Sequence, residues 1–330
     1  MQAVITRDQK SGVSGLSVAE VPYPHAAEND VIVRVHAASF TPGELDWPGT
    51  WTDRAGRDRT PAIPGHEVSG VVAELGYGTT GLTVGQRVFG VTDWARNGTL
   101  AEYVAVEARN LAPLSGGIGH TVAASVPISG LTAWQALFDH GRLAAGQTAL
   151  IHGAAGAVGS MAVQLALEAG ARVIGTGRAR HGDTVLGLGA HSFVDVDRHR
   201  IEDLDEVDLV LDVIGGETLD RSANLVRPGG VLVTIAEPAR VVPEHGRAIF
   251  FVVEPNRSCL MRIERRIRDG RLRPPAVTVL PLSDAVAAFD PKHRVGKPVI
   301  QLATDDLGSN GTTASTRLTE PGHRFADLPA

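Results

Sequence analysis

The amino-acid sequence predicts an α/β protein that combines a β-rich domain with a doubly wound parallel-sheet domain. The first 120 or so residues contain short β-rich runs broken by Gly, Asn and Asp. Further along the chain, six strand-like runs alternate with helical or loop segments, which is the pattern of a doubly wound parallel sheet. The length of 330 residues is enough for two domains, each with its own core.

Each predicted element follows from its local pattern. In the first domain, residues 31–40 alternate with the two-residue period of a strand, and shorter runs of this kind are VSGVVAEL, QRVFGV and AEYVAV. A helical pattern begins at Thr132 and runs to Phe138. The six predicted strands of the second domain are TALIH, ARVIGT, SFVDV, DLVLDV, GVLVTI and IFFVV. Between the first two lies AVGSMAVQLALEAG, whose small and apolar residues suit a helix buried against a sheet.

The chain after Pro255 begins with an amphipathic helix, SCLMRIERRIRDG, that ends at Gly270. VTVLPL and KPVIQL then look β-rich again, and this segment is too small to stand alone. We therefore expect residues 256–303 to rejoin residues 1–122 as one discontinuous domain, with residues 123–255 as the other. Residues 304–330 are polar and poor in apolar side chains, so we predict a disordered tail there.

Composition excludes several classes of protein. Thirty-one basic and 37 acidic residues give a net charge of −6, which argues against a nucleic-acid partner. No run of about 18 apolar residues is present, so we expect no membrane span, and the first residues lack the pattern of a secretion signal. The single cysteine, Cys259, excludes an intramolecular disulfide and a multi-cysteine zinc site. A cytoplasmic enzyme is the expectation.

The sharpest motif is GAAGAVG at residues 153–159, between a predicted strand and a buried helix. A pyrophosphate needs close approach to the backbone at a helix N-terminus, where N–H groups are unpaired and the helix dipole is positive. Gly156 and Gly159 suit that approach, whereas Ala154 stands where a glycine is more usual. The predicted contacts with a dinucleotide in this turn are Ala154, Ala155, Gly156, Ala157, Val158 and Gly159.

The end of the second strand of this domain indicates which dinucleotide is bound. An acidic residue usually holds a free ribose 2′-hydroxyl about 20 residues after the glycines. Here Thr176 is followed by Arg178 and Arg180, and no acid comes before Asp183. Guanidinium groups bind a 2′-phosphate, so we predict NADPH, with Thr176 and both arginines at the cofactor. The alternative is that the arginines are ordinary solvated loop residues.

Many segments in the same order resemble the medium-chain dehydrogenase/reductase superfamily, up to about residue 303. The chain is most similar to its zinc-independent quinone oxidoreductase branch, which includes zeta-crystallin. Besides the glycine turn, the matching segments are AASFTP (37–42), PGHEVSGVV (64–72), VGQRV (84–88), AEYV (101–104), GLTAW (130–134), RPGG (227–230) and GKPV (296–299). The resemblance implies a GroES-like catalytic domain, a Rossmann domain, a cleft between them for cofactor and substrate, and a homodimer.

The resemblance also implies site residues outside the glycine turn. They are Thr41, Thr132, the strand end with Phe250, Phe251 and Val252, and Lys297. Thr132 could instead cap a helix, Lys297 could be a surface lysine, and the phenylalanines could be core residues. Because neighbours on a strand face opposite sides, one of the phenylalanines is expected to reach the cleft.

Zinc alcohol dehydrogenases of the superfamily hold their metal with cysteine and a His-Glu pair. His66-Glu67 is present here, but the position of the first cysteine reads Phe40-Thr41. Because a tetrahedral zinc site needs three or four convergent donors, we predict no metal and a structural role for the pair. Glu44 is interpreted either as a site residue or as a solvated turn residue.

Without a metal, the protein offers hydrogen bonds, exclusion of water and placement of the substrate. A quinone or an α,β-unsaturated carbonyl spreads the arriving charge and needs less help than a simple ketone. Tyr103 is the candidate proton donor, although its strand pattern also fits a half-buried structural residue. Trp47 and Trp51, followed by arginines at 54, 57 and 59, are the candidate substrate rim, or else a surface loop.

The leading hypothesis is a zinc-free, NADPH-dependent reductase of quinones or α,β-unsaturated carbonyls. One alternative is an enoyl-thioester reductase, for which the arginines at 54–59 would form a basic entrance. A second alternative, from another class, is a non-catalytic NADPH-binding or RNA-associated protein with a basic patch at residues 262–273.

Overall fold

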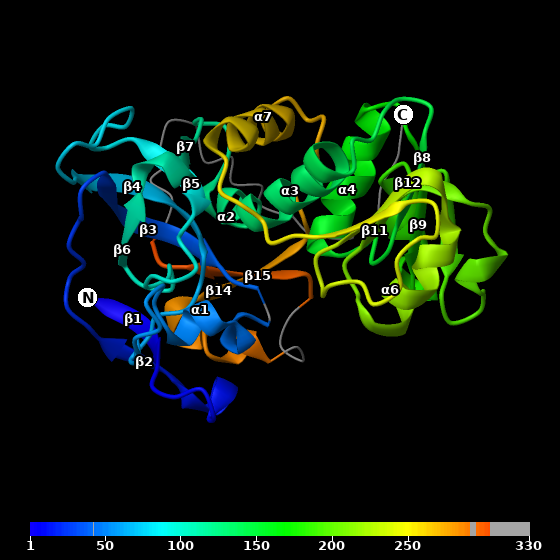
Figure 1. The fold of residues 1–330 in the computed structure, drawn as a ribbon. Helices are drawn as coiled ribbons and strands as arrows, with labels where there is room; N and C mark the ends of the chain where they lie inside the picture. The colour runs from blue at the N-terminus through cyan, green and yellow to red at the C-terminus, as the bar shows by residue number, and fades with distance from the viewer. Residues whose placement is uncertain (42, 291–294, 304–330) are drawn as a thin grey trace, which may run out of the picture.

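The computed structural model describes residues 1–41, 43–290 and 295–303. Figure 1 shows two lobes: a β-rich lobe in blue and cyan, joined by orange strands, and a green and yellow lobe built around a second sheet. This architecture confirms the predicted pairing of a GroES-like domain with a Rossmann domain. The predicted tail at 304–330 lies outside the described residues.

The first domain is built on a mostly antiparallel sheet with the strand order β14-β15-β3-β4-β5-β7, and β6 pairs with β3. The strands are β3 (Asp30–Ser39), β4 (Glu67–Leu75), β5 (Arg87–Val91), β6 (Tyr103–Glu107), β7 (Leu111–Pro113), β14 (Val277–Pro281) and β15 (Lys297–Gln301). A separate antiparallel hairpin is formed by β1 (Gln2–Thr6) and β2 (Leu16–Glu20). β3 is almost wholly buried because it has partners on both sides.

Two strands from the end of the chain complete this sheet. β15 runs antiparallel to β3, with Val299 opposite Ser39, and β14 is parallel to β15. In Figure 1 both appear in orange within the blue lobe. The chain therefore leaves the first domain, forms the second, and returns.

The second domain contains six parallel strands in the order β10-β9-β8-β11-β12-β13. They are β8 (Thr148–Ile151), β9 (Arg172–Gly177), β10 (Ser192–Asp195), β11 (Val207–Asp212), β12 (Val226–Thr234) and β13 (Arg247–Phe250). Five of them coincide with predicted strands, whereas β13 ends at Phe250 and shares only Ile249 and Phe250 with the predicted run IFFVV. β11 is buried along its whole length, as expected for a central strand covered on both faces. The strand order reverses between β8 and β11, and ligands bind at the carboxyl ends of such a pair.

The helices are α1 (Pro48–Trp51), α2 (His120–Ala124), α3 (Pro127–Trp134), α4 (Ala157–Glu168), α5 (Gly182–Gly187), α6 (Gly216–Ser222) and α7 (Arg257–Arg268). α3 begins at Pro127 and continues as a π-helical turn through His140, so Thr132 lies well inside a helix. Its alternative role as a helix cap is therefore wrong. No helix in the described part of the chain is long and apolar enough to cross a membrane.

Helix α7 joins the core of the second domain. Its buried residues Cys259, Leu260 and Ile263 belong to the same apolar cluster as α3 and α4. Arg257, at its start, donates to the backbone carbonyls of Ala108 and Leu111 in the first domain. The predicted domain boundary lies just before residue 256, and helix α7, which follows it, packs on the second domain. The chain returns to the first sheet at β14.

Candidate functional site

The glycine turn lies between β8 and α4, at the point where the strand order of the sheet reverses. Gly153 has φ +63°, and a Cβ there would lie 2.7 Å from Val213 Cγ2. At Gly159 a Cβ would lie 2.2 Å from the carbonyl oxygen of Gly153, so any side chain would push helix and turn apart. These two glycines are required by packing and backbone conformation, whatever ligand is bound.

Gly156 serves a different purpose. It is the N-cap of α4, is solvent-exposed, and would bring a Cβ no closer than 3.2 Å to the Gly153 oxygen. The N–H groups of the first helical turn, at Ala157, Val158 and Gly159, have no partner within a helix. An exposed glycine before these donors forms an open backbone cradle suited to an anion such as a pyrophosphate.

Beneath the turn, His152 is fully buried between two hydroxyls. Its Nδ1 lies 2.8 Å from Thr176 Oγ1 and its Nε2 lies 2.8 Å from Ser222 Oγ. Because Ser222 donates its own proton to the Thr218 carbonyl oxygen, the imidazole must donate from Nε2 and accept at Nδ1. Burial lowers the pKa of His152 from 6.5 to about 4, so the ring is neutral.

This depressed pKa gives a testable pH dependence. The unfolded chain binds a proton at His152 below pH 6.5, and the folded chain does so only near pH 4, so folding stability is lost as the pH falls through this window. We expect the loss from this group to be on the order of 3 kcal/mol. Urea unfolding across the window should show a shallower pH dependence for His152→Gln than for the wild type. An unchanged pH dependence in that variant would contradict this, and His245→Gln, at an exposed histidine, is the control.

The predicted residues at the end of β9 divide into two groups. Thr176 is buried, bonds to His152, and accepts a hydrogen bond from the N–H of Ala154, so it supports the glycine turn from below. Arg178 and Arg180 follow the strand and are exposed beyond its carboxyl end. Both arginines therefore lie at the sheet edge where the ribose of a dinucleotide is expected.

Asp212 ends β11, the strand on the other side of the reversal. It is buried, which raises the pKa of its carboxyl group, and it accepts hydrogen bonds from the N–H groups of Ile214 and Gly215 and from Thr234. Asp212 therefore orders the turn after its strand.

The predicted Phe250–Val252 segment lies at the end of the edge strand β13. Phe250 is 42% exposed and Val252 is 60% exposed, whereas Phe251 is buried against His140, with ring centroids 4.4 Å apart. The expected alternation is present, and Phe251 is a core residue.

In the first domain, Thr41 lies just beyond β3, beside a buried carboxylate. The side chain of Glu44 accepts from the backbone N–H groups of Thr41 (3.2 Å) and Gly65, and it lies 3.3 Å from His66 Nδ1. Glu44 and His66 are both almost completely buried. The interpretation of Glu44 as a solvated turn residue is therefore wrong: this carboxylate fixes the loop that carries Thr41 and orients the imidazole.

Aromatic rings surround this histidine at the seam between the domains. The His66 ring lies 5.7 Å from Trp47 and 5.0 Å from Trp94, and the two indoles meet edge to face at 5.4 Å. Trp94 also packs against an apolar cluster that contains residues of both domains, among them Val91 of β5 and Met161 of α4. The sequence prediction included Trp47 but missed Trp94, which lies in a loop with no local motif around it.

Trp51 is a correction to the predicted substrate rim. Only 7% of its surface is exposed, it belongs to the core of the first domain, and its indole N–H donates to the Leu45 carbonyl oxygen at 2.7 Å. Trp51 lies on the buried side of helix α1, so its ring points into the core. Arg54 and Arg57, further along this loop, pair with Asp93 and Asp53.

Lys297 also departs from its prediction. It is buried, and its ammonium group lies 2.6 Å from Glu67 Oε1, 2.5 Å from Glu67 Oε2 and 2.9 Å from Ser129 Oγ. Glu67 in turn accepts from the N–H of Ile128 at 2.8 Å. Burial raises the pKa of Glu67 and lowers that of Lys297, and each opposite charge acts against these shifts. The lysine is thus neither a surface residue nor free for a cofactor: it joins β15 to β4 and α3.

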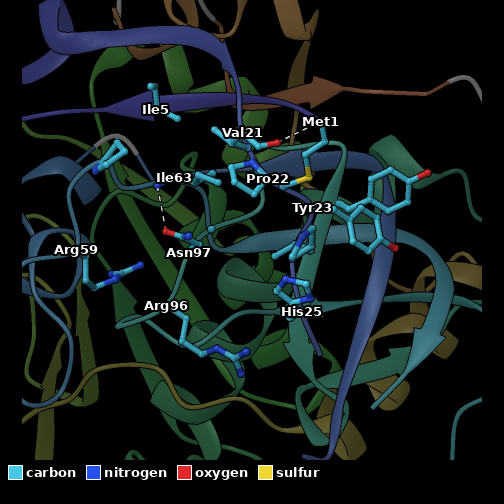
Figure 2. Close-up of a pocket in the computed structure, with 16 residues that line it drawn as sticks. Met1, Ile5, Val21, Pro22, Tyr23, His25, Arg59, Ile63, Arg96 and Asn97 are labelled. Atoms are coloured by element: carbon cyan, nitrogen blue, oxygen red, sulfur yellow. Dashed lines mark hydrogen bonds between the residues drawn. The ribbon is translucent and has the colours of Figure 1, made fainter. Parts of the chain in front are cut away.

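Tyr103 lies on β6, with its ring 4.9 Å from that of Tyr23. Together they line a cavity of about 580 Å³ whose walls come entirely from residues 1–105 (Figure 2). None of the glycine-turn residues contributes to that wall. The structure therefore does not bring Tyr103 together with the glycine turn, and its role as proton donor stays a prediction.

Comparisons with known proteins agree with this architecture. Residues 27–116 match the alcohol dehydrogenase GroES-like domain, and residues 157–258 match the zinc-binding dehydrogenase family. The chain is 30% identical over 301 residues to the chloroplastic NADPH-dependent alkenal/one oxidoreductase of Arabidopsis thaliana, covering 86% of this chain and 74% of that protein. A solved quinone oxidoreductase from Coxiella burnetii superposes with a TM-score of 0.83 at 26% identity, covering 92% of this chain and 99% of the other.

A third relative is much longer. The spectinabilin polyketide synthase system protein NorB of Streptomyces orinoci is 34% identical over 290 residues, but these cover 78% of this chain and only 13% of NorB. The two domain matches together span more than half of the chain, in the order and positions that the structure shows. The chain is therefore an oxidoreductase that belongs to the medium-chain dehydrogenase/reductase superfamily, in its zeta-crystallin-like quinone oxidoreductase branch.

Proposed function

We propose that this chain uses NADPH to transfer hydride to a quinone or an α,β-unsaturated carbonyl compound. The observation that carries the proposal is the open backbone cradle at Gly156, at the strand-order reversal, with two exposed arginines at the end of the next strand. The names of the Arabidopsis and Coxiella proteins support the substrate class. When bound, the nicotinamide ring supplies hydride to an electron-poor carbon.

The backbone N–H groups of the glycine turn would hold the cofactor. We propose that residues 154–159 bind the pyrophosphate, and that Thr132, Phe250 and Val252 contribute contacts nearer the nicotinamide. In the first domain, Thr41 would place the substrate through its hydroxyl, with Glu44 fixing its loop. Trp47 and Trp94 would exclude water from the reacting carbon, because both lie around the buried His66 at the domain seam.

The choice of NADPH over NADH depends on Arg178 and Arg180. A charge-assisted bond from a guanidinium to a 2′-phosphate is stronger than a neutral one, and NADH lacks that phosphate. We expect Arg180→Ala to raise the KM for NADPH by about tenfold and to leave that for NADH nearly unchanged. Steady-state kinetics with both cofactors provide the measurement, and Arg172→Ala, at the opposite end of β9, is the control. A wild-type preference for NADH would contradict the assignment.

We propose further that the reaction requires no zinc. The carboxylate of Glu67 is already paired with the Lys297 ammonium, so it offers no free charge to a second cation. Cys259 is buried in α7, within the core of the second domain. Among the described residues, no three or more His, Cys, Asp or Glu side chains converge. The donors present do not fit a tetrahedral zinc site.

An enoyl-thioester reductase is the second candidate, favoured by the similarity to a segment of a polyketide synthase. The structure weakens the case for the basic entrance predicted for such an enzyme, because Arg54 and Arg57 are neutralised by Asp93 and Asp53.

The basic segment at residues 262–273, which was the candidate contact with RNA, is also largely paired. Arg266 and Arg271 both pair with Glu168, and Arg268 pairs with Glu264. We propose no nucleic-acid partner.

Following NADPH oxidation with a naphthoquinone, a simple enone and a crotonyl thioester separates these candidates. Our proposal expects turnover with the first two and much slower turnover with the thioester. Reaction with the thioester alone would favour the second candidate. Tight NADPH binding without oxidation by any acceptor would favour a non-catalytic protein.

We also propose a cytoplasmic homodimer that pairs the exposed edge of β13. Among the described residues this strand has a partner on one side only, so its other edge is open to pairing with a second copy. Light scattering should give the mass of two chains, and the mass of one chain at micromolar concentration would contradict the proposal.

A further inference from the structure

The cavity of about 580 Å³ in the first domain is separate from the candidate active site. Its volume falls within the range of small-molecule sites. It is formed by Met1 and Ile5, the segment after β2, the loop segments at 59–63 and 96–98, and strand β6 (Figure 2). A molecule bound here would contact no residue of the second domain.

The walls of the cavity are mainly apolar and aromatic. Val21, Pro22, Ile63 and Val104 supply aliphatic surface, and the Tyr23 ring packs against a second tyrosine. The residues that line the cavity include no Asp and no Glu. The polar groups of these residues are two guanidiniums, the Met1 amino group, the His25 imidazole, two phenols and an amide, a set that disfavours a cationic ligand.

The two arginines in the wall differ in their partners. Arg96 is held by both carboxylate oxygens of Asp30, at 3.0 and 2.5 Å. Arg59 donates from Nη1 to the Gly49 carbonyl oxygen, whereas its Nη2 is buried without a partner. In the part of the chain that the structure describes, no carboxylate forms an ion pair with Arg59.

The positive charge of Arg59 is only partly compensated by the residues around it. Burial lowers the pKa of its guanidinium, and the charges of Asp93 and Asp53, which are paired with Arg54 and Arg57, act against that shift without reversing it. A half-buried cation loses hydration, and neither of these carboxylates forms an ion pair with Arg59 to compensate for that loss. An anionic ligand in the adjoining cavity would add an opposite charge close to the guanidinium. Figure 2 shows Arg59 on one side of this cavity and Tyr23 on the other.

We propose that this cavity binds a small monocarboxylate with an aromatic or branched apolar body, whose carboxylate pairs with Arg59. A planar carboxylate matches the forked donors of a guanidinium. Of the two arginines in the wall, Arg59 is the one with no ion pair to a described carboxylate, since Arg96 is already neutralised by Asp30. The apolar body lies against Val21, Pro22 and Ile63. This is a second ligand site, independent of the cofactor and of the reduction proposed above.

Calorimetric titration with two probes of the same shape tests the proposal. Naphthalene-2-carboxylate and its uncharged amide differ only in the group that Arg59 would bind. We expect the carboxylate to bind at least about tenfold more tightly, from the strength of a hydrogen bond to a charged group. Arg59→Gln should abolish that preference. Arg57→Gln is the matched control, because Arg57 belongs to the same loop, is exposed, and does not line the cavity.

Two further measurements test the proposal even if the Arg59→Gln substitution disturbs the loop that carries this residue. Ala105→Leu adds volume to the cavity wall on β6 and should weaken both probes severalfold without touching the loop. Saturating NADPH should leave binding of the carboxylate unchanged. Equal affinity for the two probes, unaltered binding in Ala105→Leu, or displacement by NADPH would each overturn the proposal. None of these results depends on whether the chain reduces a quinone or an enone.

Discussion

Replacing Gly159 with Ala is expected to abolish useful NADPH binding. Its Cβ would lie 2.2 Å from the Gly153 oxygen and 2.8 Å from the Ala154 Cα, so the turn and helix α4 must separate. A shift of about 1 Å in a positioning element lowers activity by about a hundredfold. We expect a loss of at least that size in kcat/KM for NADPH, measured with a quinone acceptor.

Two glycines provide the controls for this prediction. Gly187→Ala adds a Cβ with no heavy atom within 4 Å and should leave activity and stability unchanged. Gly156→Ala keeps an allowed backbone conformation but places a methyl group at the open cradle, so it should fold normally and bind NADPH about tenfold more weakly. Wild-type NADPH affinity in both Gly156→Ala and Gly159→Ala would remove the turn from the cofactor site.

The second large effect is expected at the buried ion pair. Lys297→Met leaves the carboxylate of Glu67 buried with no opposite charge, which should lower the free energy of unfolding by about 3–5 kcal/mol. The double variant Glu67→Gln with Lys297→Met should recover much of this loss, because no uncompensated charge is left behind. Urea unfolding of the three proteins measures the effect.

An exposed pair offers the matched comparison. Arg221 bonds to Glu202 through two hydrogen bonds at the surface, and Arg221→Met should change stability little because water solvates the remaining charge. If Lys297→Met destabilises the chain no more than Arg221→Met does, the pair does not hold the seam between β15, β4 and α3.

Much of the fold was predictable because its signals are local. Six apolar runs separated by crossovers specify the parallel sheet, and each of them overlaps with an observed strand, the last by only two residues. The turn at residues 153–159 was predictable for the same reason, since the glycines, the preceding strand and the following helix are adjacent in sequence. The observed strand order then places this turn where the sheet can bind a ligand.

The rest of the site depends on contacts between distant residues. Glu67 and Lys297 are 230 positions apart, and neither sequence neighbourhood shows that they meet. Trp51 was predicted at the substrate rim but lies in the core, whereas the fold brings Trp94, for which nothing was predicted, next to His66. One signal was available: the alternating acids and arginines at residues 53–59 indicate local pairing for Arg57.

The path of the hydride tests the central claim most directly. With NADPH deuterated at the transferred position and a simple enone, in buffer containing a strong zinc chelator, the product should be a saturated ketone. It should carry one deuterium at the carbon β to the carbonyl group. Deuterium at the carbonyl carbon of an allylic alcohol, or a reaction that stops when zinc is chelated, would contradict the account.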